Sequence, residues 1–162
     1  MTLTLRPEPL TAAGFAPFGE ILDTEGRDSI AINQGTARRF HRLAEIDTDP
    51  EGTAVLSIFR ADARKLPLDV MLMERHPLGS QAFMPLQDDP YLVVVAGDPA
   101  EPRSFRAFRA RRQGVNFRRG AWHHPLIALS RGTSFLIADR DGPGENLEEY
   151  PLREGMIVVS DD

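Results

Sequence analysis

The stretch Gly114-Val115-Asn116-Phe117-Arg118-Arg119-Gly120-Ala121-Trp122-His123-His124-Pro125-Leu126 says most about the fold of this chain. A short apolar run leads into a glycine turn at Gly120, a second run carries two adjacent histidines, and a proline ends it. Successive side chains of a strand point to opposite faces, so at most one of His123 and His124 faces a given site. The pattern predicts two short strands that present an imidazole at a strand end.

A second polar cluster, Glu74-Arg75-His76-Pro77-Leu78-Gly79-Ser80-Gln81, precedes this stretch, and the two segments hold three of the 4 histidines. In a strand, Glu74 and His76 share one face and Arg75 takes the other. Together with Gln81 and His123 they offer a carboxylate, two imidazoles and an amide oxygen. That set suits a divalent metal, and it suits metal-free acid/base chemistry equally well. A solvated Glu-x-His pair and a structural histidine doublet are the simpler alternatives.

The rest of the chain predicts an all-β fold, a barrel or sandwich, because short β-like runs alternate with turns rich in its 13 Gly and 13 Pro. The continuous apolar run Tyr91–Ala96 predicts a central strand buried on both faces. Helical signals are limited to a turn over residues 12–16, capped by Thr11, and a turn or two over residues 38–46. The predicted strands are residues 2–6, 19–23, 54–60, 68–74, 81–85, 91–96, 103–109, 114–117, 121–124, 133–138 and 155–160.

Length and composition predict one soluble domain over residues 1–162, with 41% hydrophobic and 27% charged residues and no linker. No apolar run approaches the roughly 18 residues of a membrane span, and the N-terminus lacks the pattern of a secretory signal. We therefore expect a cytoplasmic protein without a membrane partner. The absence of cysteine excludes disulfides, thiolate ligands and a cysteine nucleophile.

The charge pattern indicates which kinds of molecule the protein can bind. A net charge of −5 argues against a nucleic-acid partner. Of the 19 basic residues only Lys65 is a lysine, and its polar surroundings make Schiff-base catalysis an unfavoured mechanism. Arginine is thus the abundant cation for an anionic small molecule, and its planar fork suits carboxylates. The arginine-rich run 103–112 is predicted to be a half-buried strand with a solvated face, or else to turn one arginine toward a ligand.

The two polar segments resemble the two motifs of the cupin barrel. Glu74-x-His76 stands where that motif has His-x-His, and Gln81 stands at its Glu position. Gly114 opens the second motif and Arg118-x-Gly120-x-x-His123 ends it, with Arg118 in place of Pro. The resemblance implies a cupin-like β-barrel or double-stranded β-sandwich with one or two short helices. Two of its four metal-ligand positions, 74 and 81, depart from the cupin pattern.

Over nearly its whole length the chain also resembles the ureidoglycolate lyase family. The matching segments are Phe15-x-Pro17-Phe18-Gly19-Glu20-Ile21, Ile32-Asn33-x-Gly35, Arg39-Phe40-His41, residues 74–83, residues 113–117, Trp122-His123-His124-Pro125-Leu126 and Asp139-Arg140. The resemblance implies a carbon–nitrogen lyase of allantoin (purine) degradation that cleaves (S)-ureidoglycolate to glyoxylate and urea. It also implies a homodimer and a divalent cation such as nickel, with no organic cofactor.

The residues fit such chemistry, because breaking the C–N bond of a hemiaminal needs only a base and an acid. We expect Glu74, His76, Gln81 and His123 to form the site and to be the metal ligands if a metal is bound. Glu74 or His76 would be the base, and His123 or His124 the acid. Gln81, Arg75, Asn33 and Arg39 are the candidate substrate-binding residues; Arg39 and His41 reach the site from a loop or a second subunit, or are a surface pair.

The alternative from another class is a cupin-like sensor or small-molecule binding module without turnover, since one fold hosts many functions.

Overall fold

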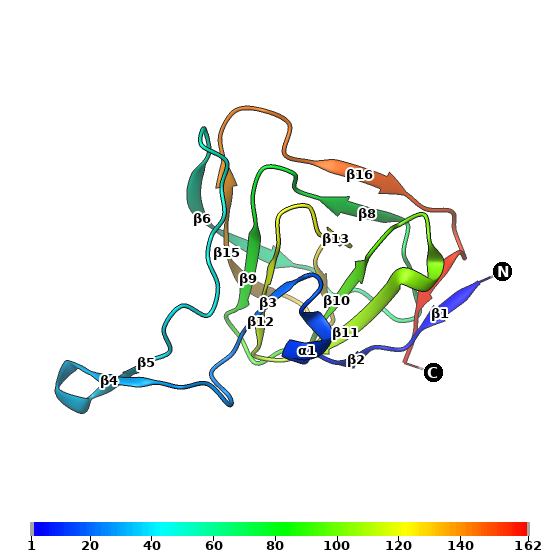
Figure 1. The fold of residues 1–162 in the computed structure, drawn as a ribbon. Coiled ribbons are helices and arrows are strands. Elements are labelled where there is room, and N and C mark those ends of the chain that lie inside the picture. The colour runs from blue at the N-terminus through cyan, green and yellow to red at the C-terminus, as the bar shows by residue number, and fades with distance from the viewer. Residues whose placement is uncertain (1, 162) are drawn as a thin grey trace.

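The computed structural model describes residues 2–161, and two facing β-sheets form most of it (Figure 1). The first sheet contains, in spatial order, β16 (Glu148–Pro151), β8 (Leu72–Arg75), β13 (Trp122–His123), β10 (Tyr91–Ala96), β11 (Phe105–Ala110) and β2 (Glu8–Pro9), with β14 (Ile127–Ala128) also paired to β10. The second contains β3 (Gly19–Leu22), β12 (Gly114–Phe117), β9 (Gln81–Pro85), β15 (Thr133–Asp141) and β6 (Thr53–Ala61). The predicted all-β, cupin-like sandwich is confirmed.

Strand β10 lies at the centre of the first sheet and is buried on both faces, as its apolar run predicts. Tyr91, Val93 and Val95 belong to the apolar cluster between the two sheets, whereas Leu92 and Val94 belong to a second cluster on the outer face. Side chains alternate along a strand, so a run without polar residues can bury both faces only if something covers each one.

A small third sheet contributes to that outer cluster. It contains β1 (Leu3–Leu5), β17 (Ile157–Val159) and β7 (Leu68–Asp69), with β1 and β17 parallel. The two ends of the chain therefore lie on the same side of the molecule (Figure 1). Leu68, Ile157 and Val159 add their side chains to the second cluster.

The predicted first helix is confirmed as α1 (Ala12–Phe15). The Thr11 hydroxyl accepts a hydrogen bond from the Gly14 amide at 3.1 Å, which satisfies one of the free N–H groups of the first turn. Phe15 is fully buried in the cluster between the sheets, so this short helix anchors the N-terminal segment to the core.

The predicted second helix, over residues 38–46, is wrong. Its first residues belong to β5 (Ala37–Arg39), which pairs with β4 (Ile30–Ile32) in a separate hairpin, and Arg42 has the positive φ of 56° that ends any helix. The hairpin turn is the 3₁₀ turn Asn33–Gly35. Figure 1 shows this hairpin, which we call the arm, extending away from the two main sheets. Pairing between strands decides the structure of this segment and outweighs its local helical signal.

No helix among residues 2–161 has both the length and the apolar character needed to cross a membrane.

Candidate active site

Adjacent strands of the first sheet carry the carboxylate and one imidazole of the predicted site. Strands β8 and β13 are antiparallel, with Glu74 directly opposite His123, and such cross-strand partners share a face. His76 follows the end of β8. Gly120 has a φ of 76°, which suits glycine, and its amide donates to the His76 carbonyl oxygen at 2.9 Å. The glycine turn expected from the sequence therefore ties the two polar segments together.

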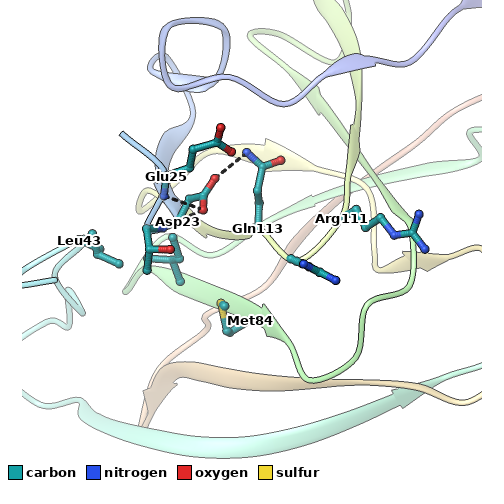
Figure 2. Close-up of a pocket in the computed structure, with 9 residues that line it drawn as sticks. Asp23, Glu25, Leu43, Met84, Arg111 and Gln113 are labelled. Carbon is teal, nitrogen blue, oxygen red and sulfur yellow. Dashed lines mark hydrogen bonds between the residues drawn. The ribbon is translucent and has the colours of Figure 1, made fainter. Parts of the chain in front are cut away.

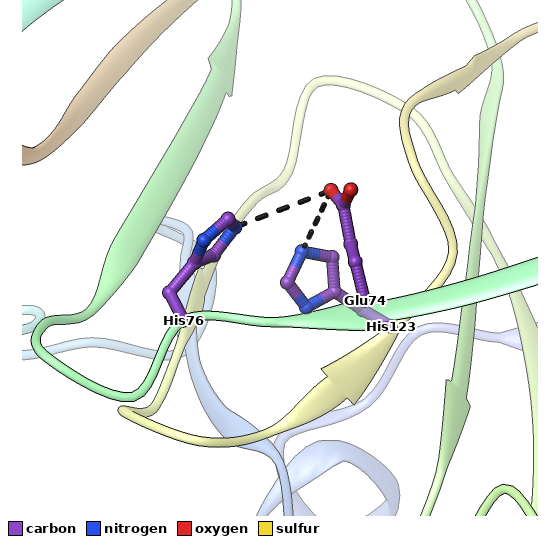
Figure 3. Close-up of side chains that lie close together, drawn as sticks. All are labelled: Glu74, His76 and His123. Carbon is purple, nitrogen blue, oxygen red and sulfur yellow. Dashed lines mark ion pairs between the residues drawn. The ribbon is translucent and has the colours of Figure 1, made fainter. Parts of the chain in front are cut away.

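Glu74, His76 and His123 converge on one point (Figure 3). Glu74 Oε1 lies 3.5 Å from His123 Nε2 and 4.0 Å from His76 Nε2. The His123 side chain is only 2% exposed, whereas those of His76 and Glu74 are 17% and 19% exposed. The cluster is therefore buried on the His123 side and partly exposed to solvent on the side of Glu74 and His76.

Both imidazoles are held in the same way. Nδ1 of His76 lies 2.8 Å from the Asn146 carbonyl oxygen, and Nδ1 of His123 lies 2.9 Å from the Ala121 carbonyl oxygen. A carbonyl oxygen only accepts, so each Nδ1 carries a proton and each Nε2 is directed toward Glu74. Among residues 2–161, the buried Nε2 of His123 has no hydrogen-bond partner. An Nδ1–H bonded to a carbonyl with a free Nε2 is the usual arrangement of a metal-binding histidine.

Gln81 joins this cluster from the second sheet. It opens β9, is only 7% exposed, and places Oε1 3.1 Å from His76 Nε2. Its amide nitrogen donates to Asp139 Oδ2, also at 3.1 Å. Asp139 on β15 and the Asn146 carbonyl are site-shaping groups that the sequence reasoning missed. Asp139 stood in a matching segment, but only the β9–β15 register, in which Ala138 pairs with Ala82, shows that its neighbour is Gln81.

Three of these groups could hold a metal ion, because Glu74, His76 and His123 each offer a ligand atom within 4.8 Å of the others. Gln81 Oε1 lies 3.1 Å from His76 Nε2, and Glu74 Oε1 lies 3.5 Å from His123 Nε2 and 4.0 Å from His76 Nε2. Neighbouring ligands around one ion, with bonds of about 2.1 Å, have separations of this size. Glu74 Oε1, His76 Nε2, His123 Nε2 and Gln81 Oε1 are nitrogen and oxygen donors, which suit nickel, manganese, zinc or iron.

The charges of the site favour an ionised Glu74. Burial raises the pKa of this carboxyl, but His123, followed by His76 and His124, more than offsets the burial and lowers the pKa below its ordinary value. A carboxylate that stays ionised at neutral pH can take a proton from a substrate or bind a cation.

Phe117 fixes the plane of the buried imidazole. The two rings stack with centroids 4.1 Å apart and an angle of 9° between their planes. Phe117 comes from β12 in the second sheet, whereas His123 comes from β13 in the first, so packing between the sheets sets the orientation of the histidine. The sequence placed both residues in one stretch but gave no sign of this contact.

His124 does not join the group formed by Glu74, His76 and His123, but the expectation that it faces the other side of the sheet is wrong, because β13 ends at His123 and both histidines lie beside Phe117, between the two sheets. His124 lines a small, largely apolar cavity with Tyr91, Val115 and Leu126, and its Nδ1 lies 2.7 Å from the Pro125 carbonyl oxygen. Burial is the main reason that its pKa lies below the ordinary value.

Arg75 faces away from the cluster. Its guanidinium forms an ion pair with Glu148 and lies over the Trp122 ring, 4.7 Å from the ring centroid. The arginine-rich strand is likewise solvated, because Arg106 and Arg109 pair with Glu8 and Asp161 near the surface.

Asn33 and Arg39 lie on the arm, and His41 follows it closely. All three are exposed, and the arm extends away from the sheets (Figure 1). Within one chain the structure therefore does not bring these predicted residues to the Glu74 cluster.

A cavity of about 490 Å³ opens at the far ends of β9 and β12 (Figure 2). Asp23, Glu25, Met84, Arg111 and Gln113 are among its lining residues, and Gln113 donates to Asp23 at 3.1 Å. None of the predicted site residues lines this cavity. The Glu74 cluster lies at the opposite ends of the same two strands, where Gln81 begins β9 and Phe117 ends β12.

Comparison with known proteins agrees with the motifs. The family model described as ureidoglycolate lyase matches residues 2–159. The chain is 49% identical to the ureidoglycolate lyase of Pseudomonas entomophila (strain L48), over 96% of each chain. It is 50% identical to that of Stutzerimonas stutzeri (strain A1501), over 98% of this chain and 95% of the relative. For the lyase of Pseudomonas syringae pv. syringae (strain B728a) the identity is 49%, over 95% and 93%. The chain therefore belongs to the ureidoglycolate lyase family.

Proposed function

We propose that this protein is a lyase that cleaves (S)-ureidoglycolate to glyoxylate and urea. The observation that carries the proposal is one carboxylate, Glu74, that lies 4.0 Å from Nε2 of His76 and 3.5 Å from Nε2 of His123 and is partly exposed to solvent. Family membership supports the substrate and does not favour the non-catalytic sensor.

The reaction needs one proton to move within the substrate. The hydroxyl of the hemiaminal carbon loses a proton, its oxygen forms the aldehyde C=O of glyoxylate, and the C–N bond breaks. The departing nitrogen takes a proton and leaves as urea. No water is consumed and no covalent intermediate is required.

Glu74 can serve both proton transfers. Its lowered pKa keeps it ionised, so it can accept the hydroxyl proton and deliver it to the nitrogen as the C–N bond breaks. Oε1 faces the two imidazoles, and Oε2 takes part in neither of those contacts. His124, in its apolar surroundings, has no part in this scheme.

Glu74, His76, His123 and Gln81 would hold the divalent ion, for which we propose nickel from the family resemblance. When bound, such an ion supplies Lewis-acid polarisation of the substrate's hydroxyl and carboxylate oxygens. The protein contributes the orientation of the donors, through the two Nδ1–carbonyl contacts and the stack of Phe117 on His123.

We also propose that the protein acts as a homodimer in allantoin degradation, in the cytoplasm. Support for the dimer comes from exposed apolar side chains on the arm and on β6: Ile30 and Ile32, with exposed fractions of 57% and 36%, and Leu56 and Ile58, with 70% and 56%. Exposed apolar groups of this kind often mark a contact between chains. Light scattering coupled to size-exclusion chromatography measures the oligomeric state.

Product analysis tests the proposed activity. Purified protein is incubated with ureidoglycolate, with and without a chelator, and urea, glyoxylate and ammonia are followed. Urea and glyoxylate in equal amounts support the lyase. Ammonia and CO₂ in place of urea would indicate an amidohydrolase, and no product in either condition would indicate a binding module.

Two matched variants test the site. Glu74→Gln should lower kcat/KM by about 10²–10⁴-fold, the usual contribution of a general base. Glu148→Gln removes an exposed carboxylate on the neighbouring strand β16 and should leave kcat/KM unchanged. Equal activity of the two variants would contradict the role of Glu74.

A further inference from the structure

The amide of Gln81 has two different ends, and each faces a different partner. Its nitrogen donates to Asp139 Oδ2 at 3.1 Å, and its oxygen lies 3.1 Å from His76 Nε2. An ionised carboxylate only accepts hydrogen bonds, so the NH₂ end has to face Asp139. A flipped amide would place two acceptor oxygens together at Asp139, and it would turn the NH₂ group, which cannot bind a metal ion, toward Nε2 of His76. Asp139 therefore selects the orientation of Gln81.

Asp139 is well anchored for this task. It comes next in β15 after Ala138, which pairs with Ala82 of β9, and is followed by Arg140. The Arg140 side chain is only 1% exposed. Its Nε donates to Asp49 at 2.8 Å, and its Nη2 donates to the Pro143 carbonyl oxygen. This buried cation fixes the end of β15 and the start of the loop after it.

The same segment also holds His76. Asn146 accepts the Nδ1 proton of His76 through its main-chain carbonyl at 2.8 Å, and its side-chain oxygen accepts from the Leu78 amide at 2.8 Å. Residues 139–146 thus orient two of the donor groups, Gln81 through Asp139 and His76 through Asn146.

We propose that Asp139 is a positioning residue that turns the Gln81 oxygen toward the metal position and so makes a neutral amide serve where the cupin motif has Glu. The inference rests on the proposed function, in particular on the metal site. A carboxylate at position 81 has two equivalent oxygens and needs no such orientation. It would, however, lie against the Asp139 carboxylate at the present 3.1 Å contact, and like charges so close repel. Gln81 and Asp139 therefore form a matched pair.

A double-mutant cycle with nickel titration tests the pair. Asp139→Asn offers an NH₂ group that allows Gln81 to flip, so nickel affinity in isothermal titration calorimetry should weaken about 10- to 100-fold, as is usual for a residue that orients a metal ligand. Gln81→Glu alone should also weaken binding. The double variant Asp139→Asn/Gln81→Glu should regain much of the lost affinity, because the amide introduced at position 139 can donate to the new carboxylate.

Activity and a control complete the experiment. In nickel-loaded protein, kcat should follow the order of the affinities. Asp141→Asn, an exposed change on the same strand, should leave both unchanged. If Asp139→Asn fails to fold, the change in nickel affinity of Gln81→Glu still tests the proposal. Weaker binding is expected, and tighter binding by that single variant would overturn the proposal.

The remaining outcomes separate this inference from the proposed function. Wild-type affinity in Asp139→Asn, or no recovery in the double variant, overturns the positioning role while turnover by the wild type still supports the lyase. Wild-type protein that binds no nickel yet releases urea and glyoxylate also overturns the inference alone. Wild-type protein that binds nickel but forms no product contradicts the proposed function, and the affinity cycle still tests the pair.

Discussion

Replacing Phe117 with leucine should separate the support of His123 from the general stability of the core. Phe117 is 5% exposed and stacks on the imidazole at 4.1 Å. Leucine fills much of the same space but presents no flat face, so the ring of His123 gains freedom to tilt. Phe135→Leu is the matched control, because Phe135 is fully buried in the same cluster and its ring contacts are with Phe83 and Tyr91.

The expected loss of stability is similar for the two variants. Replacing a core Phe with Ala lowers the free energy of unfolding by about 3–5 kcal/mol. Leucine keeps four of the phenylalanine side chain's carbon atoms, so Phe→Leu should lower it by about 1–2 kcal/mol. Losing the aromatic contacts adds about 0.5–1.5 kcal/mol. The sum of about 1.5–3.5 kcal/mol corresponds to a fall in Tm of about 3–14 °C for a chain of this size.

The activities should differ. Phe117→Leu should lower kcat/KM by up to about 100-fold, because small misplacements of a group at a reacting centre have effects of that size. Phe135→Leu should stay near the wild-type value. Urea denaturation gives the free energy of unfolding, and initial rates of urea release, measured well below both midpoints, give kcat/KM. Equal activity of the two variants, whether both high or both low, would refute the link between the stack and catalysis.

Three further predictions concern the rest of the molecule. The pKa of His124 is held below its ordinary value of 6.5, so the unfolded chain binds the proton more tightly than the folded chain does. The free energy of unfolding should therefore fall as the pH drops below about 6.5. In urea titrations at successive pH values, His124→Gln should flatten this dependence, and an unchanged slope would contradict the prediction. Tyr91→Phe removes the hydrogen bond from the buried hydroxyl to the Gln113 carbonyl and should cost about 1 kcal/mol in urea denaturation, whereas no cost would show that this carbonyl finds another donor. Replacing exposed Ile30 and Ile32 of the arm with threonine should change the stability of a dilute, monomeric sample by less than about 0.5 kcal/mol, and a larger loss would mean that the arm supports the sheets.

Local patterns in the sequence predicted much of the fold. The apolar run of β10, the Thr11 cap of α1 and the glycine turn at Gly120 each depend on residues close together in the chain, and each is present as predicted. The period of two along a strand also put Glu74 on one side and Arg75 on the other, and the structure shows that separation.

The site was predictable only in part. The order of residues already shows which donor groups are available: one carboxylate, two imidazoles and an amide in two short segments, without cysteine. It could not determine that Asp139 and Asn146 hold Gln81 and His76, because these contacts join residues 58 and 70 positions apart. Nor could it show that residues 37–39 form a hairpin strand. Strand register and the packing of one sheet on the other depend on residues far apart in the chain, so only the folded chain shows which polar side chains meet and which face solvent.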